Sequence, residues 1–189
     1  PSPPFSPPSP PLAFTSDWHT NEGYNNSYME PLFQVTTSTT FLLSFDLNFT
    51  YYTGWMHILT IGDNRSPSIY INNNGLTDDD KLYFSYHSNA SSYKASNNFN
   101  QHYNNIVLNQ YVEYSVRISF QPNGTGFYDL NICIDDVCEG FTSPSDFFPI
   151  APQTAFVKFN GFDGGTKIRN LNYETSIPSP SPPPSPPPS

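Results

Sequence analysis

Three stretches of this chain alternate strictly between apolar and polar residues, which restricts each of them to a β-strand. The clearest is Phe41–Thr50, where Leu43, Phe45, Leu47 and Phe49 alternate with polar residues, and residues 112–120 and 128–134 follow the same rule. Successive side chains of a strand point to opposite faces, so the pattern describes strands with one face on a core. We therefore expect an all-β protein built from antiparallel strands.

Shorter strands are predicted between these three, separated by clusters of Gly, Asn, Asp and Pro. The predicted segments are Met56–Ile61, Ser68–Ile71, Lys81–Tyr86, Ala155–Phe159 and Lys167–Tyr173. Residues 87–105 are polar and are expected to form a loop. Many short strands at this spacing predict a two-sheet sandwich or a barrel, and no segment predicts a helix of three turns.

Both ends of the chain are proline-rich. Residues 1–12 read PSPPFSPPSPPL, residues 176–189 read SIPSPSPPPSPPPS, and together they hold most of the 21 prolines. Proline lacks the amide donor and fixes φ, which excludes a helix interior or a central strand but allows polyproline II. We expect polyproline II over 1–12, a β-sandwich over 13–175 and polyproline II over 176–189. The chain begins within its repeat, which indicates a processed chain or a piece of a longer one.

Charge and hydropathy exclude two kinds of partner. The net charge is −9 and the pI about 4.5, and an acidic surface repels phosphate backbones, so no nucleic-acid partner is expected. No stretch reaches the roughly 18 apolar residues that a membrane-spanning helix needs, so no membrane span is expected.

Cys133 and Cys138 are the only cysteines, and they flank Asp135-Asp136. A two-residue turn at these aspartates would place Ile134 opposite Val137 and Cys133 opposite Cys138. The pair would be non-hydrogen-bonded, with Cα atoms about 4.5 Å apart, a separation that a disulfide accepts. Half of a metal site is the alternative, but no second cysteine pair or nearby histidine completes it. The disulfide is the favoured reading.

Five N-glycosylation sequons begin at Asn25, Asn48, Asn64, Asn89 and Asn123. Chance explains several in a chain so rich in Asn, Ser and Thr. Asn48, however, has an outward place in a predicted strand, and Asn64 and Asn123 fall in predicted turns. Sequons and a disulfide together indicate the secretory route and an extracellular protein.

Four segments resemble the concanavalin A-like, laminin-G-type superfamily of lectins and glucanases. They are Phe41–Thr50, the pair Trp55–Asp63 with Pro67–Ile71, the pair Val112–Phe120 with Tyr128–Asp135, and Gly165–Tyr173. The resemblance covers residues 28–175 and implies a two-sheet antiparallel jelly-roll sandwich. It does not transfer a function.

The proline-rich ends resemble the Ser-Pro-Pro modules of extensin- and pherophorin-type hydroxyproline-rich cell-wall glycoproteins of plants and green algae. That resemblance implies prolyl hydroxylation and O-glycosylation. The positions to which it applies are Pro3, Pro4, Pro7, Pro8, Pro10, Pro11, Pro178, Pro180, Pro182, Pro183, Pro184, Pro186, Pro187 and Pro188.

Residues for catalysis are not apparent. Retaining glucanases of the superfamily carry E-x-D-x-x-E, which places two acids about 5–5.5 Å apart. None of the five glutamates (Glu22, Glu30, Glu113, Glu139, Glu174) has that spacing. The four histidines (His19, His57, His87, His102) are isolated, and no nucleophile elbow, phosphate-binding loop or H-E-x-x-H is present. We expect a protein that is not an enzyme.

Two features leave alternatives open. The first is a possible calcium site formed by Asp78-Asp79-Asp80, with Asp63, Asp135 and Asp136 at turns. Calcium needs about six to eight oxygen ligands, which favours a solvated turn for the aspartate triplet. No cofactor is therefore expected. The second feature is a set of aromatic residues that could stack on sugars or fill the core: Tyr51, Tyr52, Trp55, Tyr83, Tyr86, Tyr93 and Tyr103.

The sequence supports three hypotheses. The first is a secreted structural glycoprotein, a subunit of an extracellular fibre, appendage or cell-wall matrix, whose partners are copies of itself and its attached N- and O-glycans. Its sandwich would pack into the assembly, and its stiff proline-rich rods would act as spacers or as the filament axis. The second is a lectin-like adhesion module that binds polysaccharide. A divergent polysaccharide hydrolase is a weak third.

Overall fold

The computed structural model describes residues 12–13, 16–20, 30–36, 40–50, 54–61, 67–73, 81–87, 99–125, 127–143, 154–159 and 165–175. These residues form strands and turns, and none of them is helical. No helix in this part of the chain is therefore long and apolar enough to cross a membrane. Residues 1–11 and 176–189, with all the prolines predicted to be hydroxylated, lie outside the described residues.

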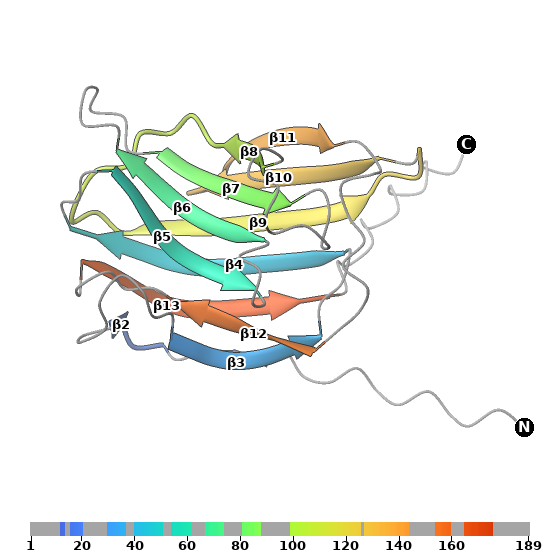
Figure 1. The fold of residues 1–189 in the computed structure, drawn as a ribbon. Helices are drawn as coiled ribbons and strands as arrows, with labels where there is room; N and C mark the ends of the chain where they lie inside the picture. Colours follow the sequence, from blue (N-terminus) through green and yellow to red (C-terminus); the bar gives the residue numbers. More distant parts are fainter. Residues whose placement is uncertain are drawn as a thin grey trace, which may run out of the picture.

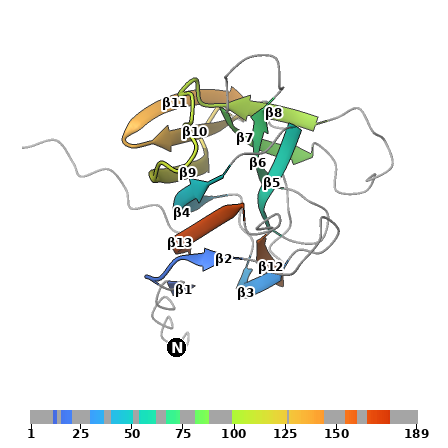
Figure 2. The same ribbon diagram turned by 90° about the vertical axis from the view of Figure 1, so that its left-hand side faces the viewer.

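Two antiparallel sheets stack face to face, as Figures 1 and 2 show. Sheet A has the order β1-β13-β4-β9-β10-β11, and β2 also pairs with β13. Its strands are β1 (Leu12–Ala13), β2 (His19–Thr20), β4 (Phe41–Phe49), β9 (Tyr114–Pro122), β10 (Tyr128–Ile134), β11 (Val137–Ser143) and β13 (Thr166–Glu174).

Sheet B has the order β3-β12-β5-β6-β7-β8. Its strands are β3 (Glu30–Thr36), β5 (Gly54–Ile61), β6 (Ser68–Asn73), β7 (Lys81–His87), β8 (Phe99–Tyr103) and β12 (Thr154–Phe159). The predicted all-β, two-sheet antiparallel jelly-roll sandwich is confirmed.

The core lies between the sheets and is built by the alternating residues. In β4 every second residue from Phe41 to Phe49 is buried, and the residues between them are half-buried on the outer face, including Asn48. Phe41 of sheet A meets Phe84 of sheet B with ring centroids 6.3 Å apart, so aromatic rings join the two layers directly. Burying each such ring contributes about 2–3 kcal/mol, which makes this alternation the main source of the fold's stability.

The loop expected over residues 87–105 and one predicted strand start were wrong. Residues 99–103, expected within a loop, form β8 and pair with β7 from Tyr83↔Tyr103 to His87↔Phe99. Backbone pairing with a neighbouring strand organises this segment, although its polar sequence has no apolar alternation. The strand expected to begin at Val112 begins at Tyr114, because Tyr111 has a left-handed backbone (φ 61°) and Val112 is exposed.

Candidate functional site

Two rows of side chains cross the outer face of sheet B. The first, called the aromatic row here, consists of His57, Tyr70, Tyr83 and Tyr103, one from each of β5, β6, β7 and β8. Each is the direct cross-strand partner of the next. Their sequence neighbours Met56, Ile69, Ile71, Leu82 and Phe84 are buried in the core, so the alternation of the strands points the row outward.

Ring contacts join the members of the aromatic row in two pairs. His57 stacks on Tyr70 with centroids 4.3 Å apart and planes 18° apart. Tyr83 meets Tyr103 at 5.2 Å with planes tilted by 41°, and the Lys81 ammonium lies 5.1 Å from the Tyr103 ring centroid. His57 is buried, Tyr70 and Tyr83 are half-buried, and Tyr103 is exposed. The accessible part of the row therefore consists of its three tyrosines, with Lys81 beside Tyr103.

The second row, called the hydroxyl row here, consists of Thr60, Ser68 and Ser85, which are successive cross-strand partners on β5, β6 and β7. All three residues are buried. A β-bulge at Ile58 shifts the register of β5, so that Ile58 and Leu59 are both buried in the core while His57 and Thr60 share the outer face. One hydrogen bond joins His57 Nε2 to Thr60 Oγ1 (3.2 Å) and another joins Thr60 Oγ1 to Ser68 Oγ (2.5 Å).

The hydroxyl row ends in an unsatisfied group. Ser85 is buried, and its Oγ has no hydrogen-bond partner among the described residues. A buried hydroxyl without a partner costs free energy, and in native proteins such groups call for a specific explanation. At the other end of the row Lys158 of β12 is the cross-strand partner of Thr60.

A charged cluster lies on the outer face of sheet A. Arg169 Nε donates to Asp46 Oδ2 (3.1 Å), its Nη2 donates to Glu113 Oε1, and the indole of Trp18 lies 4.5 Å from the guanidinium carbon. The hydrogen bond to Asp46, and then the negative charge of Glu113, raise the pKa of Arg169, against the lowering effect of desolvation. Arg169 thus stays charged and bridges the carboxylates of Asp46 and Glu113. The spacing of these residues in the sequence did not predict the bridge.

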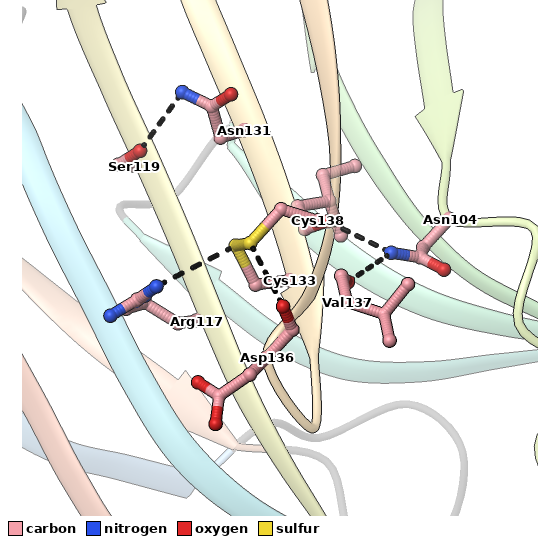
Figure 3. The surroundings of a disulfide bond; sticks show 9 residues. Asn104, Arg117, Ser119, Asn131, Cys133, Asp136, Val137 and Cys138 are labelled. Atoms are coloured by element: carbon pink, nitrogen blue, oxygen red, sulfur yellow. Dashed lines mark hydrogen bonds between the residues drawn. A yellow bond between two sulfur atoms is a disulfide. The ribbon is translucent and has the colours of Figure 1, made fainter.

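The predicted disulfide hairpin is confirmed (Figure 3). Cys133 is bonded to Cys138 with Cα atoms 4.0 Å apart, and Ile134 pairs with Val137 across the turn. Asp135 and Asp136 have φ angles of 47° and 67°, and positive φ at both central residues is the requirement of a type I′ turn.

Buried Asn104 ties the chain to this hairpin. Its Nδ2 donates to the carbonyls of Ile132 (2.9 Å) and Val137 (3.0 Å). Figure 3 shows the bond to Val137. Its Oδ1 accepts from the Ile106 N–H at 2.9 Å. Asn105 adds a bond from its Nδ2 to Glu139 Oε1 at 2.7 Å. The connection from sheet B to sheet A is therefore anchored to the hairpin by side-chain amides.

Two of the five sequons lie in described residues. Asn48 is half-buried on the outer face of β4, opposite Lys167. Asn123 lies in the β9–β10 turn, where its Oδ1 accepts from the Thr125 hydroxyl at 2.7 Å and its Nδ2 donates to Asp129 Oδ1 at 3.0 Å. Asn25, Asn64 and Asn89 lie outside the described residues, and occupancy of all five stays a prediction.

Only some of the aromatic and aspartate candidates lie in described residues. Of the aromatic candidates, Tyr83 and Tyr103 meet in the aromatic row. The side chains of Trp55 and Tyr86 are not among those described, and Tyr51, Tyr52 and Tyr93 lie outside the described residues. Of the calcium candidates, Asp135 and Asp136 form the hairpin turn, and Asp63 and Asp78-Asp79-Asp80 lie outside the described residues. Among described residues, no group of three His, Cys, Asp or Glu could hold a metal ion.

Sequence reasoning missed most of the two rows. His57 was considered only as an isolated histidine. Tyr70, Thr60, Ser68 and Ser85 were not considered, since they are single polar residues between core residues of short strands. The alternation of β6 and β7 could have assigned them to one face. Only the pairing of β5 to β8 aligns them across the sheet.

No family model matches this chain, and no curated protein sequence matches it either. Solved structures do share its fold. An endo-β-1,4-glucuronan lyase from the fungus Trichoderma reesei is 12% identical, with a TM-score of 0.52 over 84% of this chain and 79% of the lyase chain. A heptameric SAP-like pentraxin from Limulus polyphemus is 11% identical, with a TM-score of 0.51 over 82% of this chain and 74% of the pentraxin chain. The chain thus shares the two-sheet antiparallel jelly-roll fold of these two proteins.

Proposed function

We propose that this chain is a carbohydrate-binding β-sandwich of an extracellular glycoprotein and that it binds polysaccharide chains on the outer face of sheet B. The observation that carries the proposal is the alignment of Tyr70, Tyr83 and Tyr103 of the aromatic row across three neighbouring strands. Their phenol rings match a sugar chain, which has apolar C–H faces and many hydroxyls.

The chemistry of the aromatic row suits pyranose rings. An aromatic ring has a negative face and a positive edge, so Tyr103, whose ring is exposed, can accept sugar C–H groups against its face. The phenol groups of Tyr70 and Tyr83 can each donate and accept a hydrogen bond.

We propose binding without turnover. Among described residues the carboxylates of Asp46 and Glu113 share Arg169, which holds both of them in ion pairs on the other sheet. Both carboxylates are therefore engaged in ion pairs, and they lie on the sheet opposite the aromatic row. The lyase neighbour shows that this fold accommodates polysaccharide chemistry in another protein, and a fold alone does not transfer an activity.

A glycan array followed by calorimetry tests the proposal. We expect Tyr70→Ser and Tyr83→Ser to weaken polysaccharide binding about tenfold each, since contacts at the centre of a site carry most of its energy. Phe156→Ser is the control, because Phe156 is an exposed aromatic residue on β12 of the same sheet and belongs to neither row. Equal losses in all three variants, or no array binding by the wild type, would contradict the proposal.

A second candidate function is the fibre subunit, and one observation favours it. Leu12 pairs with Tyr173, and Glu174 pairs with Leu42 at the start of β4, so the chain enters and leaves the sandwich at the same end. Both proline-rich segments are thereby attached to one pole. Negative-stain microscopy of native material should show regular filaments for a fibre subunit, and separate particles would count against it.

The same native material tests the modifications. We expect intact glycopeptide mass spectrometry to find N-glycans at Asn123 and Asn48, and hydroxyproline with O-glycans within residues 1–12 and 176–189. Unmodified prolines and unoccupied sequons would contradict the secreted-glycoprotein proposal.

A further inference from the structure

One end of the sandwich, here called the distal pole, gathers exposed apolar side chains. β4 ends there, β9 begins there, and the Asp135-Asp136 turn lies there. Residues 104–113 cross this pole from Val137, whose carbonyl binds Asn104, to Phe49, whose carbonyl accepts the Tyr111 N–H at 2.8 Å. The crossing covers three strand spacings, or about 14 Å.

Four of the large hydrophobic residues described as exposed belong to this pole. Tyr111 is 70% exposed, Val137 55%, Val112 42% and Val107 39%. Isolated exposed apolar residues are common on any protein, but a group on one surface marks an interaction site.

The backbone of Tyr111 is held in a costly conformation. Its φ of 61° is unusual for a bulky residue and costs about 1–3 kcal/mol, which the surrounding structure must offset. The bond from Tyr111 N–H to Phe49 and the bond from Asn109 N–H to the Tyr114 hydroxyl (2.7 Å) fix the turn. The strained backbone does not serve to pack the Tyr111 ring, because the ring remains exposed to solvent. We take this strain as a sign that the exposed ring is functional.

We propose that the distal pole binds the C-terminal proline-rich segment, residues 176–189, of a second copy of this chain. That segment carries no side-chain charge and is predicted to be polyproline II, a preformed helix that proteins recognise with exposed aromatic and aliphatic side chains. About five residues of polyproline II span the 14 Å between Val137 and Phe49. The exposed Asp136 carboxylate can accept hydrogen bonds from the serine hydroxyls.

Geometry favours a second copy over the chain's own segment. Residues 176–189 follow Glu174, which pairs with Leu42 at the end of β4 opposite Phe49. A chain's own segment would have to reverse direction and run back about 30 Å, the length of β4, to reach its distal pole. A neighbouring copy placed in line presents its segment directly. Such a head-to-tail contact is heterologous and repeats without closing. It uses neither row of sheet B, so it stands independently of the saccharide proposal.

Photo-crosslinking of the full chain identifies the occupant. Tyr111 is replaced by benzoylphenylalanine, and a mixture of isotopically light and heavy chains is irradiated and digested. The expected product is a mixed light–heavy peptide pair that joins position 111 to residues 176–189. A pair within one copy, a pair to residues 1–11 or to any other surface, or no crosslink would overturn the proposal.

Self-association of the full chain gives a second readout. In sedimentation velocity over a concentration series, Tyr111→Ser with Val112→Ser should weaken association about tenfold, as loss of a central anchor does. Phe127→Ser is the matched control, because Phe127 is 43% exposed in the β9–β10 turn at the opposite pole. Val137→Ser, on the hairpin, should also weaken association. Unchanged association in both pole variants, with their unfolding midpoints preserved, would overturn the proposal.

Discussion

At the scale of the residue, Asn104 has the largest predicted effect on stability. It is fully buried, donates to two carbonyls and accepts from one amide. Asn104→Ala should lower the free energy of unfolding by about 3 kcal/mol, because it removes three hydrogen bonds worth about 1 kcal/mol each and takes the Asn104 Oδ1 acceptor away from the Ile106 amide. Asn131→Ala is the control: Asn131 is half-buried and its Nδ2 makes a longer bond to Ser119 Oγ (3.4 Å), so its loss should stay below about 1 kcal/mol. Urea unfolding measures both, and similar losses would contradict the role given to Asn104.

At the scale of the element, the β10–β11 hairpin combines a type I′ turn with a short disulfide ring. Replacing both Cys133 and Cys138 by Ser should lower the free energy of unfolding by about 2 kcal/mol, the chain-entropy value for a ring of six residues. The hairpin should persist, since positive φ at Asp135 and Asp136 and the cross-strand pairs already set its register. Reduction of the wild-type protein is the control and should give the same loss in thermal unfolding. A loss above about 4 kcal/mol would mean that the covalent bond itself holds the register.

At the scale of the whole molecule, β1 and β2 protect the edge of sheet A. These two-residue strands cover β13 through the pairs of Leu12, Ala13, His19 and Thr20. His19 also reaches sheet B through its 2.9 Å contact with Glu30. Deleting residues 1–20 should lower the free energy of unfolding by about 2 kcal/mol and cause aggregation through the bare edge. Deleting only residues 1–9 is the control and should leave the unfolding midpoint unchanged. Equal behaviour of both truncations would show that the edge strands do not stabilise the sheet.

The features of the fold that could be predicted are those that depend on residues close together in the sequence. The strands with strict alternation, the Asp135-Asp136 turn and the partner of Cys133 follow from residues near each other in sequence. β3 was missed because its burial does not alternate regularly and Pro31 interrupts it. β8 was missed because its residues are mostly polar.

In the candidate site, single residues could be predicted from the sequence but their contacts could not. Tyr83 and Tyr103 were among the aromatic residues considered for sugar stacking, but nothing in the sequence set them beside His57 and Tyr70. The bridge from Arg169 to Asp46 joins residues 123 positions apart, and that to Glu113 joins residues 56 apart. Contacts of that range depend on the order of the strands, which hydrophobic periodicity does not encode.

The sequence alone therefore determined an all-β chain with an apolar face on each long strand, one closed hairpin and proline-rich ends, because these depend on side-chain periodicity and backbone chemistry. The tertiary structure decided which strands are neighbours. It thereby decided that four rings form one row, that a buried serine lacks a partner, and that both proline-rich ends are attached opposite an exposed tyrosine. Such placements depend on pairing between strands distant in sequence, where many registers bury similar apolar area and only the complete sandwich distinguishes among them.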